Sequence, residues 1–138
     1  MQSNRSLFIP ADGLYRCADP DAYRTLLDAA RTALAAAKHA RHTQCIALLT
    51  SRGRLYTEVI ADALSDAHSD EARLLDRLSA DGDTTAAKLV CMWHEGSVDA
   101  PSWAFRSMLT ALDPANAETE MLLIGKNGYL TYRIREFK

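Results

Sequence analysis

The residues of this chain that could carry out chemistry include a glutamate and two histidines. Glu71 follows His68 at a spacing of three, which allows both side chains to share one face of a helix. A glutamate can act as a general acid or base, and a histidine can bind a metal ion or move a proton. His94 follows an apolar segment farther along the chain and would complete a set of three metal ligands. The simpler interpretation is that His68 lies on a helix surface and His94 in a loop.

Glu71 and Ser102 also have simpler interpretations as residues that begin helices. A glutamate in the first helical turn stabilises the helix dipole and can close a capping box. Ser102 directly follows Pro101 and is a residue type that caps helices. The linear order of serine, histidine and aspartate residues does not define a catalytic triad. We therefore interpret Ser102 as a cap rather than a nucleophile, and both interpretations of Glu71 stay open.

Composition indicates one globular domain over residues 1–138, with an irregular segment over residues 1–18. The 138 residues are 48% hydrophobic and 25% charged, which suits a chain with a sizeable core. The net charge of -2 predicts no general affinity for nucleic acid. No apolar run approaches the length of a membrane span, which is about 20 residues. Cys17, Cys45 and Cys91 are scattered, so we expect reduced thiols and a cytoplasmic location.

Three segments have helical spacing. Asp19 and Pro20 begin the first, over residues 20–39. Ser65 or Asp66 can cap the second, which ends at residues 81–83, and Pro101 opens the third, which stops at residues 113–114. In each of the last two helices, the apolar residues have the spacing of one helix face. They are Leu74, Leu75 and Leu78 in the second helix, and Phe105, Met108, Leu109 and Leu112 in the third.

The remaining apolar runs predict five strands. Residues 44–50 and 54–60 form a hairpin around residues 51–53, because Gly53 can adopt a positive φ. The first of these strands is almost continuously apolar, which is typical of a strand inside the sheet. The other three strands are expected over residues 87–93, 120–124 and 129–134.

From about Tyr23 to the C-terminus, this order of elements resembles the cytidine deaminase family. Residues 47–57 (ALLTSRGRLYT) resemble the family's first hairpin, and residues 69–75 (SDEARLL) resemble its Cys-Ala-Glu-Arg helix. Residues 101–109 (PSWAFRSML) are similar to the Pro-Cys-x-x-Cys-Arg-x-x-Leu helix, and residues 123–128 to the fourth strand and its turn. The resemblance implies an α/β three-layer sandwich, with a mixed sheet of about five strands and helices on both faces.

The departures from the family pattern fall on its zinc ligands. The resemblance places Glu71 at the catalytic position, but the three ligand positions hold Ser69, Ser102 and Phe105. A neutral hydroxyl is a poor zinc ligand, and a phenyl ring is none at all. Without zinc there is no activated water, so we expect no zinc, no other cofactor and no hydrolytic deamination.

The pocket residues differ from the family as well. Its sugar-binding asparagine and glutamate fall on Ile60 and Asp62; Asp62 can accept a hydroxyl, whereas Ile60 cannot form a side-chain hydrogen bond. Trp103 is expected to fill the space left by metal and substrate, the alternative being that it stacks on a base or a partner. Phe105 points inward by helical spacing and is interpreted as a hydrophobic plug.

These observations predict a non-catalytic, deaminase-like domain that serves as a small-molecule-binding or protein-interaction module. The sequence does not identify the small molecule or protein, and the resemblance implies a homo-oligomer. The alternative is an active nucleoside or nucleobase deaminase, or another hydrolase. It would use Glu71 as acid and base, with His68 or His94 as metal ligand or base.

Overall fold

The computed structural model describes residues 19–137, with the exception of residues 39, 66, 126 and 127. The irregular segment expected over residues 1–18, which includes Cys17, lies outside this range, as does the helix cap expected at Asp66. No helix among the described residues combines the length and the apolar character that a membrane crossing requires.

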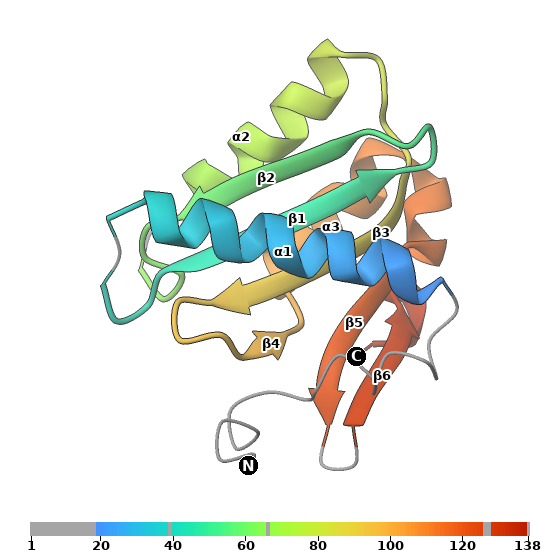
Figure 1. Ribbon diagram of the computed structural model, residues 1–138. Helices are drawn as coiled ribbons and strands as arrows, with labels where there is room; N and C mark the ends of the chain where they lie inside the picture. The colour runs from blue at the N-terminus through green and yellow to red at the C-terminus, as the bar shows by residue number, and fades with distance from the viewer. Residues whose placement is uncertain (1–18, 39, 66, 126–127, 138) are drawn as a thin grey trace.

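A mixed sheet forms the centre of the molecule, and its strand order is β2-β1-β3-β5-β6 (Figure 1). The strands β3 and β5 run parallel, and the other neighbouring pairs are antiparallel. This arrangement confirms the α/β fold and the mixed sheet of five strands. The strand bounds are β1 Gln44–Thr50, β2 Leu55–Ile60, β3 Ala86–Trp93, β5 Glu120–Gly125 and β6 Gly128–Arg133.

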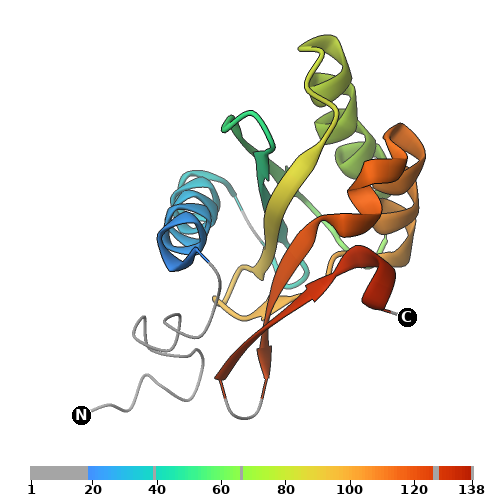
Figure 2. The same cartoon turned by 90° about the vertical axis from the view of Figure 1, so that its right-hand side faces the viewer.

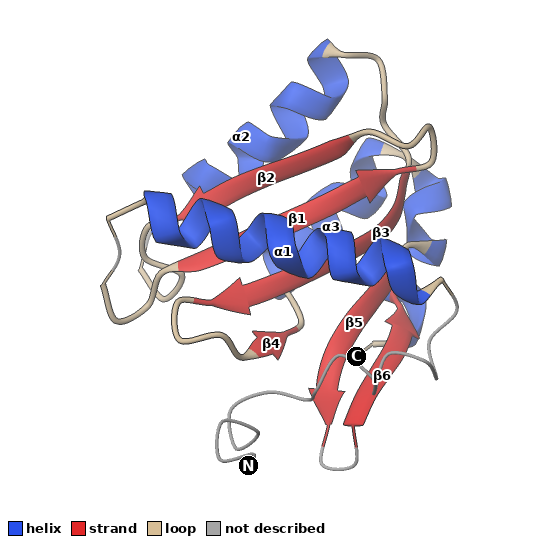
Figure 3. Cartoon of the chain, in the orientation of Figure 1, coloured by secondary structure: helices blue, strands red, loops and turns tan. Residues whose placement is uncertain are grey.

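Helices cover both faces of the sheet, as Figures 2 and 3 show. The helix α1 (Pro20–Ala36) lies on one face, and α2 (Ala67–Ala80) and α3 (Trp103–Leu112) lie on the other. Asp19 caps α1 by accepting a hydrogen bond from the Ala22 N–H, with Pro20 at the first helical position. The start of α1 is therefore as predicted, and its last helical residue, Ala36, comes three residues before the predicted end.

The sheet separates two hydrophobic clusters. On the α1 face, Leu26 and Ala30 pack with Cys45 and Ala47 of β1. On the other face, Ile46 and Leu48 of β1 belong to a second cluster. Their partners from α2 and α3 include Leu74, Leu78, Phe105 and Leu109. The strand β1 is therefore buried on both faces, which explains its nearly continuous apolar run and confirms that it lies inside the sheet.

Short elements that the apolar pattern does not reveal complete the fold. The two-residue strand β4 (Val98–Asp99) pairs with β3, and a 3-10 helix over Pro114–Glu118 follows α3. In that 3-10 helix, Asn116 is fully buried and its amide donates to the carbonyl groups of Thr84 and Leu109. Its Oδ1 accepts from the Ala86 N–H, so Asn116 ties the end of α3 to the start of β3.

Candidate functional site

Glu71 lies at the contact between α2 and α3, away from the start of its own helix. It is the fifth residue of α2, which begins at Ala67, and its side chain is only 1% exposed. The interpretation of Glu71 as a first-turn capping residue is therefore wrong. Its position is set by the apolar face of α2, because Leu74, Leu75 and Leu78 turn the same side of the helix toward the sheet.

Ser102 joins Glu71 to the beginning of α3. The Ser102 hydroxyl donates to Glu71 Oε2 at 2.9 Å, and Ser102 Oγ accepts from the Phe105 N–H at 3.0 Å. Ser102 is thus the N-cap of α3, as its residue type predicts. The carboxylate of Glu71 lies next to the positive end of a second helix, where a negative charge is favoured.

The electrostatic environment of Glu71 favours its neutral form despite that contact. Burial raises the pKa of Glu71, and the hydrogen bond from Ser102 opposes this change only in part. Among the described residues, Glu71 Oε1 has no hydrogen-bond partner. A buried carboxyl with one bonded and one unbonded oxygen is therefore held between two helices.

Phe105 occupies the space beside this pair. Its side chain is fully buried and belongs to the hydrophobic cluster between the sheet, α2 and α3. The inward orientation expected from its spacing is confirmed. Ile60 is also fully buried in the same cluster, at the end of β2.

The structure does not bring the other expected site residues together. Ser69 and His68 are exposed on α2, whereas His94 lines a groove with Arg31 and Leu34 of α1 on the opposite face of the sheet. No group of three or more histidine, cysteine, aspartate or glutamate side chains in the described part of the chain could hold a metal ion. The metal site postulated from His68, Glu71 and His94 is therefore wrong. His94 lies on the α1 face of the sheet, whereas His68 and Glu71 belong to α2 on the other face.

Asp62 has a local role in the loop after β2. Its Oδ1 accepts from the Leu64 N–H at 3.1 Å and lies 3.8 Å from His42 Nδ1. Asp62 is half-buried, and its carboxylate participates in the loop's own hydrogen bonds. Whether it also accepts a ligand hydroxyl stays a prediction.

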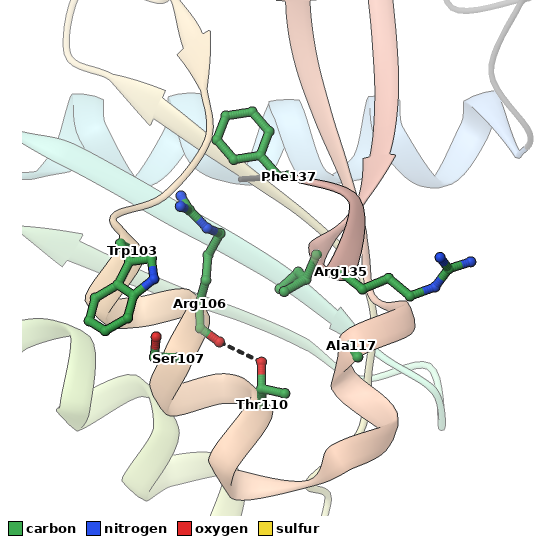
Figure 4. A pocket seen from close by; sticks show the side chains of 8 residues that line it. Trp103, Arg106, Ser107, Thr110, Ala117, Arg135 and Phe137 are labelled. Atoms are coloured by element: carbon green, nitrogen blue, oxygen red, sulfur yellow. Dashed lines mark hydrogen bonds between the residues drawn. The ribbon is translucent and has the colours of Figure 1, made fainter.

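Trp103 is 74% exposed, so the expectation that it fills a vacated pocket is wrong. Phe105 and Leu109 occupy the inward face of α3, and the first helical position turns Trp103 outward. Figure 4 shows Trp103 beside a groove that Arg106 and Phe137 also line. Phe137 was missed by sequence reasoning, because its contact with α3 depends on how the 3-10 helix over Ile134–Glu136 folds back.

Comparisons with known proteins support the fold of this site. No protein-family model matches the sequence, and no curated protein matches it either. The structure is similar to cytidine deaminase from Mycobacterium leprae, with a TM-score of 0.60 and 22% identity, over 79% of this chain and 92% of that one. It is also similar to the enzyme from Burkholderia pseudomallei, with a TM-score of 0.59 and 18% identity, over 80% and 91% of the two chains. A third similar structure is cytidine deaminase from Bacillus anthracis, with a TM-score of 0.61 and 12% identity, over 82% and 84%. The chain therefore has a cytidine deaminase-like α/β fold.

Proposed function

We propose that this chain is a non-catalytic protein. It has a cytidine deaminase-like fold but lacks the zinc ligands of the cytidine deaminase family. It acts through its surface, as a small-molecule-binding or protein-interaction module. The observation that carries this proposal is the contact between Glu71 and Ser102, in which the one candidate acid is buried and bonded to a helix cap.

The residues at the three ligand positions do not fit a zinc ion. Ser69 is exposed to solvent, and the Ser102 hydroxyl both donates to Glu71 and accepts from the Phe105 N–H. Phe105 offers only a phenyl ring, which packs in the core. Zinc sites in proteins use thiolate, imidazole or carboxylate ligands, none of which these positions provide.

The burial of Glu71 also argues against catalysis at this position. A general acid or base must come within hydrogen-bond distance of the reacting group, and the Glu71 side chain is only 1% exposed. Ile60, where the resemblance places a sugar-binding asparagine, is buried and carries no polar side-chain atom. The burial of both residues supports a role that does not depend on Glu71 or Ile60.

Metal content and ammonia release together test the proposal. The full chain should be produced with zinc in the medium and dialysed without chelator, and its metal content should then be measured. It should contain far less than one zinc per chain. It should release no ammonia from cytidine, deoxycytidine or adenosine beyond the rate of the matched Glu71→Gln variant. Close to one bound zinc per chain, with ammonia release that Glu71→Gln abolishes, would refute the proposal.

One observation favours the alternative of an enzyme that uses Glu71 as acid and base. A buried carboxyl whose pKa is raised, with an oxygen that forms no hydrogen bond with any described residue, is a common feature of catalytic sites. Such an enzyme would have to open the contact between α2 and α3 to admit a substrate. Ammonia release that is independent of zinc and abolished in Glu71→Gln would select this alternative.

A further inference from the structure

A groove outside the Glu71 site lies between α3 and the C-terminal 3-10 helix (Ile134–Glu136). Its volume is about 250 Å³, and its lining includes Trp103, Arg106 and Ser107 from α3 and Phe137 from the C-terminal segment. In Figure 4, the side chain of Arg106 lies between those of Trp103 and Phe137. The groove therefore combines two aromatic rings and a cation.

Arg106 is anchored by two contacts, and none of the described residues is its counterion. Its guanidinium donates to the Pro101 carbonyl at 2.6 Å and lies 4.8 Å from the centre of the Phe137 ring. No carboxylate among the described residues forms an ion pair with it, and partial burial lowers its pKa. A fixed, partly desolvated guanidinium with free donors is suited to bind a carboxylate or a phosphate.

The other described charges at the groove do not compensate this cation. None of the described residues that line the groove is acidic. The other arginine of the groove, Arg135, pairs with Glu118 at 2.6 Å, and its guanidinium points away from Trp103 in Figure 4. The groove is thus complementary to a negative charge at the position of Arg106.

Trp103 adds a large aromatic surface beside that charge. Its side chain is 74% exposed, although it is one of the most costly side chains to leave in water. A planar ring that stacked on the indole would remove this surface from water and lie close to Arg106. A cavity of about 150 Å³ can hold benzene, so the volume of about 250 Å³ leaves room for a ring together with an anionic group.

We propose that this groove binds an aromatic anion, that is, a planar ring carrying a phosphate or carboxylate group. The ring stacks on Trp103, and the anionic group pairs with Arg106. This inference names a ligand class for the binding role proposed above. It rests on that proposal only in assuming that the chain acts through its surface. The groove does not include Glu71, so the measurements of zinc and ammonia do not decide it.

A ligand series on the unaltered protein tests the two parts of the site separately. Binding of 1-naphthyl phosphate, 1-naphthoate, 1-naphthol and inorganic phosphate should be measured by calorimetry at low ionic strength. We expect at least one of the two naphthyl anions to bind about tenfold or more tightly than naphthol and than inorganic phosphate, because charge-assisted hydrogen bonds contribute at least about that factor. Comparing the phosphate with the carboxylate then identifies the preferred anion. Equal binding of naphthol and both naphthyl anions, or no binding of either anion, would overturn the proposal.

Variants assign the contacts. Arg106→Met should weaken binding of the preferred naphthyl anion about tenfold or more and leave naphthol binding unchanged, whereas Arg106→Lys should lose less. Trp103→Ala should weaken binding of both ligands. The matched control, Arg52→Met, removes an exposed arginine of the β1–β2 turn and should change neither. Because Arg106→Met also removes the contact with Phe137, its melting curve should be recorded, and the ligand series alone decides if the variant unfolds.

Another occupant of the groove would be recognised in the same experiments. Sedimentation of the unaltered chain and of Trp103→Ala shows whether a second copy covers Trp103. A dimer that Trp103→Ala dissociates, together with no binding of the naphthyl anions, would refute the aromatic-anion proposal in favour of self-association.

Discussion

Replacing Ser102 with alanine should reveal how strongly the contact between α2 and α3 depends on a single hydroxyl. In the structure this group donates to Glu71 Oε2 and accepts from the Phe105 N–H. The substitution removes both hydrogen bonds but retains the β-carbon, so the backbone of α3 is not otherwise perturbed. It isolates the polar contribution to an interface that is elsewhere formed by apolar side chains.

The expected cost has two parts. Loss of a serine N-cap costs about 1 kcal/mol, and a buried acceptor left without its donor costs about 1–3 kcal/mol. The free energy of unfolding should therefore fall by roughly 2–4 kcal/mol. This is a large share of the stability of an ordinary domain, which is about 5–15 kcal/mol.

The pH dependence of that loss identifies Glu71 as the partner. Burial raises the folded-state pKa of Glu71 above its usual value of 4.5, so the stability that Glu71 contributes is present below that value and is lost as the pH rises through the folded pKa. The Ser102 hydroxyl lowers this pKa, and Ser102→Ala should raise it further. Urea denaturation should therefore show a larger deficit for Ser102→Ala at pH 7.5 than at pH 4.5.

Two controls make this result specific. Ser79→Ala changes an exposed serine on α2 and should leave the denaturation midpoint within error at both pH values. In the Glu71→Gln background, the cost of Ser102→Ala should lose its pH dependence, because no titrating partner remains. A cost below about 0.5 kcal/mol, or the same cost at both pH values, would show that the hydroxyl does not support Glu71.

Two further predictions concern the same layer of the structure. Phe105→Ala should lower the free energy of unfolding by about 3–5 kcal/mol because the side chain is fully buried, whereas Trp103→Ala on the same helix should change it little because the indole is exposed; equal midpoints in thermal melting would contradict the burial of Phe105. Glu71→Gln should be at least as stable as the unaltered chain at pH 8 and should flatten its stability between pH 4.5 and pH 8, since the raised pKa of the carboxyl makes its ionisation unfavourable. Urea denaturation at several pH values in that range would contradict this prediction if the free energy of unfolding changed with pH equally in both proteins.

The main elements of the fold could be predicted because they bury regular apolar patterns. The strand β1 buries side chains on both faces and therefore has an apolar run in the sequence, and α3 buries Phe105 and Leu109 at helical spacing. The short strand β4 has no such pattern, because two residues are too few to establish alternation. Asn116 was missed for a related reason, since its three hydrogen bonds join segments that are distant in sequence.

The candidate site was less predictable because it depends on the orientation of helices. The sequence places Glu71 near a helix start, but only the packed structure shows that its carboxyl contacts the cap of α3. Trp103 was expected inside, and its exposure follows from its place just after the cap, where Phe105 already takes the inward position. The groove beside Arg106 forms only when the C-terminal segment packs near α3, and no local sequence pattern predicts this packing.

The separation of the two hydrophobic clusters gives the molecule an internal reporter of how its layers open. Cys45 belongs to the cluster under α1, and Cys91 to the cluster under α2 and α3. Burial raises the pKa of the Cys45 thiol to about 12 and that of Cys91 well above its usual value, and the thiolate is the reactive form. Alkylation of either cysteine in the folded chain therefore requires the layer above it to move. The ratio of the two labelling rates, read by peptide mass, would show whether α1 leaves the sheet before the other helices or together with them.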